Sequence, residues 1–84
     1  KATDPESGRT LTVLTTLGAV QFYSGNFLDG STTDPAGRPY TKHSGFCLET
    51  QHYPDAVNHP HFPSCILEPD QTYQHTTIFR LGQK

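Results

Sequence analysis

The sequence predicts an all-β fold class, made of the terminal strands of a large antiparallel β-sandwich. Seven prolines and seven glycines interrupt the 84 residues too often for an ordinary helix, and the apolar residues show no helical periodicity. Several short segments instead alternate apolar and polar side chains with the period of two that is typical of half-buried strands. Five such strands alone would leave long unpaired edges, so we expect further strands of the same sheet to cover them.

The amino-terminal quarter predicts a loop followed by two strands. Residues 1–8 are polar and turn-forming, and we expect a linker or loop there. Residues 9–16 place Leu11 and Val13 on one face and threonines on the other, which indicates a strand. After a short break, residues 19–23 predict the next strand.

The middle of the chain predicts a long surface loop and then a third strand. Residues 24–42 are rich in Gly, Asp, Ser, Thr and Pro, which favour turns. Residues 44–51 resume the alternation of a strand. On this strand Cys47 and Glu49 share one face, and the apolar Leu48 lies on the other.

The last third predicts an irregular segment and two further strands. Residues 52–63 contain three prolines and are expected to be irregular. Residues 64–68 and 72–81 predict two strands, joined by a turn at Pro69 and Asp70.

Composition argues against several classes of partner. Six basic and eight acidic residues give a net charge of −2, without the basic stripe that nucleic acids or anionic membranes attract. No segment approaches the roughly 20 apolar residues of a membrane-spanning helix. We therefore expect a soluble, cytoplasmic protein. A polar start and a modest 32% of hydrophobic residues lead us to expect the inside of a longer protein, whose remainder completes the core.

Histidines and cysteines are the first candidates for chemistry. A zinc site would combine His59 and His61 with a further histidine or a thiolate, but no Cys-x-x-Cys or His-x-x-x-His spacing is present, and we predict no metal site. Cys47 and Cys65 form a disulfide if the chain is secreted and stay reduced core thiols if it is cytosolic. The absence of a secretory feature favours reduced thiols.

Glu49 is unusual because glutamate is depleted in strands and this one follows an apolar run. Two interpretations stay open. Glu49 either faces outward, alone or in a structural salt bridge, or it lies at the floor of a cleft where partial burial tunes its carboxylate to act as a base.

Aromatic and amide side chains gather just after the second predicted strand begins. Their planar apolar faces and amide groups suit the hydroxyl edges and C–H faces of a sugar ring, although strand aromatics more often belong to a core. These residues are Gln21, Phe22, Tyr23, Asn26 and Phe27.

Four blocks of sequence carry a likeness to a known family. Their order and content resemble the carboxy-terminal motifs of aldose 1-epimerases, and the likeness runs from about Arg9 to Leu81. The blocks are residues 21–30, 42–51, 54–58 followed by 62–63, and 69–77.

The resemblance implies a galactose mutarotase-like supersandwich, with residues 1–84 as the carboxy-terminal part of one domain. It implies interconversion of the α and β anomers of hexoses such as galactose and glucose, without a cofactor. Glu49 matches the general base and Gln21 a substrate-binding residue. The general-acid histidine lies upstream in the family, and none of the five histidines here matches it. The implied partners are a hexose and the amino-terminal portion of the same protein or a complementary chain. A non-catalytic carbohydrate-binding relative is the alternative.

Overall fold

The computed structural model describes residues 1–84 and contains strands, turns and loops. Its regular elements are β1 (Ala2–Thr3), β2 (Arg9–Thr15), β3 (Ala19–Tyr23), β4 (Cys47–Gln51), the 3-10 turn η1 (Ala56–Asn58) and β5 (Thr77–Gln83). The prediction of an all-β chain with antiparallel strands is confirmed. No helix in the chain is long and apolar enough to span a membrane.

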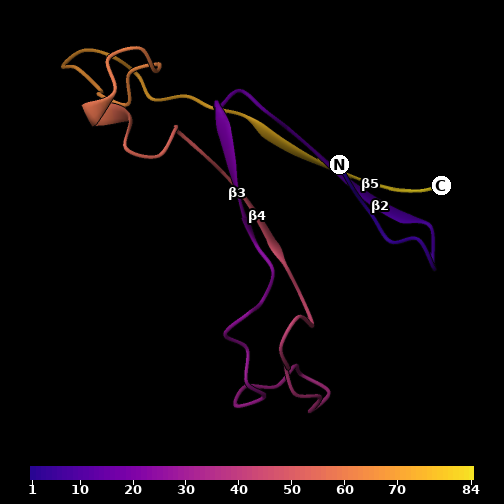
Figure 1. Ribbon diagram of the computed structural model, residues 1–84. Coiled ribbons are helices and arrows are strands. Elements are labelled where there is room, and N and C mark those ends of the chain that lie inside the picture. Colours follow the sequence, from indigo (N-terminus) through magenta and orange to yellow (C-terminus); the bar gives the residue numbers. More distant parts are fainter. The chain divides into compact units, whose positions relative to one another are not determined.

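The chain divides into two compact units, and the first unites Lys1–Ala19 with Thr50–Lys84. This unit contains a three-stranded sheet in the order β1-β2-β5. Figure 1 shows its strands β2 and β5 side by side. β2 and β5 pair antiparallel without interruption, from Arg9 opposite Gln83 to Thr15 opposite Thr77. Threonine, valine, leucine and isoleucine suit these strands because branched and apolar side chains pack well on a pleated surface. The two chain ends therefore meet at the same sheet.

The edges of this sheet differ from the sequence-based expectation. Residues 1–8 are not a loop alone, because β1 pairs with β2 through Ala2 opposite Leu11. A turn follows in which the backbone N–H of Gly8 donates to the Asp4 carbonyl at 2.9 Å. The last strand begins at Thr77 rather than residue 72, because its ladder with β2 begins there.

The strand predicted for residues 64–68 is wrong. These residues form no ladder with any other part of the chain. The Ser64 hydroxyl instead accepts a hydrogen bond from the backbone N–H of Ile66 at 3.1 Å. A local bond of this kind competes with strand pairing. The turn predicted at Pro69 and Asp70 is present, since the backbone N–H of Gln71 donates to the Glu68 carbonyl.

The second unit, Val20–Glu49, contains most of β3 and β4, which pair in a two-stranded sheet. β3 spans the predicted residues 19–23, whereas β4 begins three residues later than the predicted start at 44. A long loop connects the two strands, as expected (Figure 1). Within the loop, the backbone N–H of Asp34 donates to the Arg38 carbonyl at 2.9 Å, and the Asp34 carboxylate accepts the Arg38 N–H and forms an ion pair of 2.6 Å with the Arg38 side chain.

Gly25, two residues after the end of β3, is the one buried residue of the chain. Its φ of +73° lies in the left-handed region, which disfavours any residue with a Cβ. Its carbonyl accepts the backbone N–H of His43 at 3.1 Å, and the His43 Nδ1 donates to the Ser24 carbonyl at 2.8 Å. These hydrogen bonds connect the two ends of the loop between β3 and β4, at Ser24–Gly25 and at His43.

We predict that Gly25→Ala destabilises the full-length protein more than Gly37→Ala does. Both glycines have a φ near +80°, so alanine at either position costs about 1–2 kcal/mol of backbone strain. Only at Gly25 would the new Cβ also lie 2.7 Å from a backbone oxygen, that of Gly45; at Gly37 nothing lies within 4 Å. Denaturant unfolding should show at least about 1 kcal/mol between the two variants. Equal losses would contradict this account of the loop.

Neither unit buries an apolar side chain. Exposed fractions reach 87% for Phe27 and 81% for Leu81, although both are large and apolar. A folded domain hides such side chains because each fully buried one contributes about 1.5–3 kcal/mol. Large apolar side chains therefore stay exposed in both units.

Candidate functional site

The contact between Phe22 and Phe46 establishes which side chains share a face of the β3–β4 sheet. Their ring centroids lie 6.3 Å apart, so both rings project from the same side. Side chains alternate along a strand, and Leu48 in β4 therefore lies on this apolar side. Gln21 in β3 and Glu49 in β4 lie on the opposite side.

That opposite side, which we call the Gln21–Glu49 face, also carries Tyr23. The Phe27 ring lies nearly parallel to the Tyr23 ring at a centroid distance of 6.4 Å, and the Tyr23 hydroxyl accepts the backbone N–H of Phe27. The sequence grouped Phe22 with these residues as a sugar contact. Phe22 belongs instead to the apolar side, because its ring packs against Phe46.

Glu49 is exposed on this face, and its carboxylate has no hydrogen-bond or ion-pair partner in the chain. The residues described leave Glu49 exposed and give it no structural salt bridge. Cys47, two residues earlier, is also exposed and is not a core thiol; both Cys47 and Cys65 are free.

The Gln21–Glu49 face combines a free carboxylate, an amide and two aromatic rings. Gln21 is exposed, and its Nε2 makes one long bond of 3.3 Å to the Phe22 carbonyl. The amide keeps an unused acceptor and donor, which can bind two neighbouring hydroxyls. A carboxylate accepts a proton, and aromatic rings cover the C–H face of a pyranose. The groups on this face are thus of the kinds that contact hydroxyls and accept a proton.

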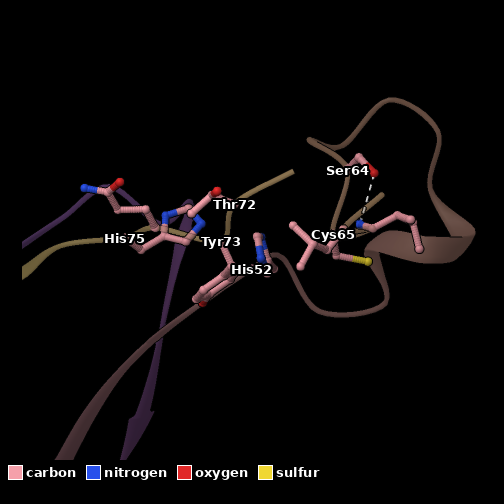
Figure 2. Close-up of a pocket in the computed structure, with 9 residues that line it drawn as sticks. His52, Ser64, Cys65, Thr72, Tyr73 and His75 are labelled. Carbon is pink, nitrogen blue, oxygen red and sulfur yellow. Dashed lines mark hydrogen bonds between the residues drawn. The ribbon is translucent and has the colours of Figure 1, made fainter. Parts of the chain in front are cut away.

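A pocket in the first unit has a different lining. It holds about 260 Å³ and is lined by His52, Ser64, Cys65, Ile66, Leu67, Thr72, Tyr73, Gln74 and His75 (Figure 2). The rings of His52, Tyr73 and His75 meet edge to face, with His52 and His75 5.5 Å apart. Neither Gln21 nor Glu49 lines it. Sequence reasoning missed this ring cluster, for which the alternation of Tyr73 and His75 was the only signal.

The remaining histidines make local contacts. His59 Nε2 lies 3.1 Å from an Asp55 carboxylate oxygen, and the amide of Asn58 donates to the other carboxylate oxygen. His61 packs edge to face on Phe62. No group of three or more His, Cys, Asp or Glu side chains is close enough to hold a metal ion.

The acidic groups with shifted pKa values are three aspartates in turns and loops. The Ser7 side chain, with backbone N–H groups, lowers the pKa of Asp4. The Ser31 side chain lowers the pKa of Asp29, and the backbone N–H of Arg38 that of Asp34. Each aspartate accepts hydrogen bonds within its own turn. These hydrogen bonds stabilise the turn, and they lower the pKa because they favour the charged carboxylate.

Known proteins resemble this chain over nearly its whole length. The family model described as aldose 1-epimerase matches residues 1–80. Proteins named galactose mutarotase from Bos taurus and Homo sapiens are 61% and 60% identical over 76 residues, 90% of this chain. A protein named aldose 1-epimerase from Escherichia coli (strain K12) is 43% identical over 72 residues, 83% of this chain. The chain spans 20–22% of the length of these relatives.

Proposed function

The chain belongs to the aldose 1-epimerase family, and we propose that the protein containing it interconverts the α and β anomers of hexoses such as galactose and glucose. The observation that carries this proposal is the Gln21–Glu49 face, which brings a free carboxylate and an unsatisfied amide to one side of a two-stranded sheet. The names of the relatives favour the same reaction.

In the proposed mechanism Glu49 is the general base. Its carboxylate takes the proton from the C1 hydroxyl while an acid outside this chain protonates the ring oxygen, and the C1–O5 bond breaks. Rotation about the C1–C2 bond presents the other face of the aldehyde, and ring closure returns both protons. Each positioned proton transfer typically contributes about 10²–10⁴-fold. The mechanism requires no redox cofactor, because the sugar is neither oxidised nor reduced.

We propose that residues 1–84 are the carboxy-terminal part of one sandwich domain. The exposed apolar side chains support this, as does the match to about a fifth of each relative's length. The amino-terminal portion, or a complementary chain, would supply the general acid and the walls that turn the Gln21–Glu49 face into a cleft. We further propose a cytoplasmic location, in keeping with two free thiols.

Polarimetry on the complete protein tests the proposed activity. Fresh α-galactose should reach its equilibrium rotation faster with the protein than in buffer alone. A non-catalytic carbohydrate-binding relative is the competing possibility, because related folds host both sugar binding and catalysis. If calorimetry shows galactose binding but polarimetry shows no acceleration of mutarotation, the protein is a non-catalytic carbohydrate-binding relative and the proposal is overturned.

We predict that Gln21→Ala weakens sugar binding without weakening the fold. The variant lacks the amide that would contact the sugar hydroxyls. Within the chain this amide makes only one hydrogen bond, the long one to the Phe22 carbonyl. We expect kcat/KM to fall about 10-fold, as for the loss of one or two hydrogen bonds, with little change in Tm. Gln83→Ala is the matched control, since Gln83 is also exposed on a strand and makes one long bond to a backbone carbonyl. Unaltered sugar kinetics in Gln21→Ala would remove Gln21 from the site.

A further inference from the structure

The pocket of Figure 2 lies wholly within the first unit, and no Asp, Glu, Lys or Arg lines it. A phosphate or carboxylate ligand usually meets Arg or Lys, and a hard cation usually meets Asp or Glu. With a volume of about 260 Å³ and no charged group of these kinds, the pocket suits a small neutral ligand.

Three rings form the aromatic part of this lining. Tyr73 packs edge to face on His52 and on His75, and the two histidines pack edge to face on each other. The centroids lie 4.7 to 6.2 Å apart, and the planes meet at 65° to 87°. Rings at such angles form no parallel-sided slot for a flat heterocycle, but they can cover the C–H face of a puckered ring. Ile66 and Leu67 add aliphatic surface to the lining.

Polar groups of the same lining have unused hydrogen-bonding capacity. The Tyr73 and Thr72 hydroxyls and both ring nitrogens of His52 make no hydrogen bond within the chain. The Ser64 hydroxyl accepts the backbone N–H of Ile66 and keeps its own proton to donate. Neutral donors and acceptors therefore stand beside aromatic rings, which is the combination that a sugar needs.

His75 is the ring of this cluster that a hydrogen bond orients. The Thr16 hydroxyl accepts the backbone N–H of Thr76 at 3.0 Å, and its oxygen lies 3.1 Å from His75 Nδ1. Its proton is available to Nδ1, because the other acceptor, the Thr76 carbonyl, is 3.5 Å away. This bond favours the neutral tautomer in which Nε2 carries the proton. His75 thus keeps an N–H donor that has no partner in the chain.

We propose that this pocket is a second, non-catalytic binding site for a neutral hexose. The ring cluster covers a C–H face of the sugar, and the Nε2–H of His75 and the hydroxyls of Thr72 and Tyr73 bind sugar hydroxyls. This site goes beyond the proposed function and does not depend on it, because neither Gln21 nor Glu49 lines the pocket.

The test follows the histidine ring signals of the full-length protein by NMR during titration with methyl β-galactoside, whose blocked C1 prevents ring opening. The His52 and His75 signals should shift and reach saturation, whereas the signal of His61, which lies outside the pocket, should stay in place. The shifts should persist in Gln21→Ala, which alters the proposed catalytic site. Loss of the shifts in that variant, or no saturable shift in the parent, would overturn the inference. Inorganic phosphate should move neither signal, and saturable shifts with phosphate would contradict a site for neutral ligands.

Three variants test the lining itself. Tyr73→Ala should raise the Kd for the galactoside at least about 10-fold, because it removes one ring of the cluster. Tyr73→Phe keeps the ring and should raise the Kd only about threefold, through loss of the hydroxyl. Tyr40→Ala is the matched control, since Tyr40 is also an exposed tyrosine but lies outside the pocket, and it should leave the Kd unchanged. A Tyr73→Ala protein with the Kd of the parent would overturn the proposal. Failure of the proposed function is a separate result, because it appears in polarimetry and not in these spectra.

Discussion

Glu49→Gln is expected to lower kcat of the full-length protein by at least about 10²-fold while leaving its Tm nearly unchanged. Glutamine keeps the size and hydrogen-bonding reach of the side chain but cannot accept the C1 hydroxyl proton, so the variant loses one positioned proton transfer. The fold should not respond, because Glu49 is exposed and forms no ion pair within the chain. A coupled assay for kcat and thermal unfolding for Tm measure the two effects.

The control for this variant is Glu68→Gln. Glu68 is also an exposed glutamate without an ion pair, but it lies in the turn near Pro69 and outside the Gln21–Glu49 face. It should keep both kcat and Tm. If Glu49 only faces solvent, the two variants behave alike. Turnover close to that of the parent in Glu49→Gln would remove Glu49 from the mechanism.

The isolated 84-residue chain is expected to show no cooperative thermal transition. Ordering each residue costs about 1–2 kcal/mol of backbone entropy, and burial of apolar side chains normally offsets that cost. This chain buries none of them. Its two sheets have only three and two strands, close to the size at which a sheet stops being stable alone.

Circular dichroism and calorimetry on the isolated chain test this expectation. Mixing the chain with the amino-terminal portion that we propose should restore a transition, because the strands of that portion would cover the exposed apolar side chains. The upstream portion alone is the control. A cooperative transition of the isolated chain as a monomer would show that its own contacts suffice.

The alternation of apolar and polar side chains predicted β2 and β3 well, because this pattern lies within each segment's own sequence. β3 lies where the alternation places it, and β2 begins at the predicted residue and ends one residue early. The strand expected at residues 64–68 failed for a reason outside its own sequence. An extended segment becomes a strand only when a partner satisfies its backbone, and no part of this chain pairs with it.

Gln21 and Glu49 could both be named from the sequence, one by its amide and the other as a glutamate in an apolar strand. The sequence could not show that these two side chains share a face of the sheet. Their shared face follows from the contact of Phe22 with Phe46, which joins two strands separated by a long loop. The sequence had grouped Phe22 with the candidate sugar contacts, and only the packing assigns it to the other side.

The sequence by itself determined the all-β class, the turns and the candidate residues for the proposed chemistry, because alternation and turn preference are properties of neighbouring residues. Only the tertiary structure decided which residues meet across strands. The contact of Thr77 with Thr15 and Thr50 depends on register and pairing between segments 27 and 62 residues apart. Such contacts form when the whole sheet assembles, and no local pattern specifies them.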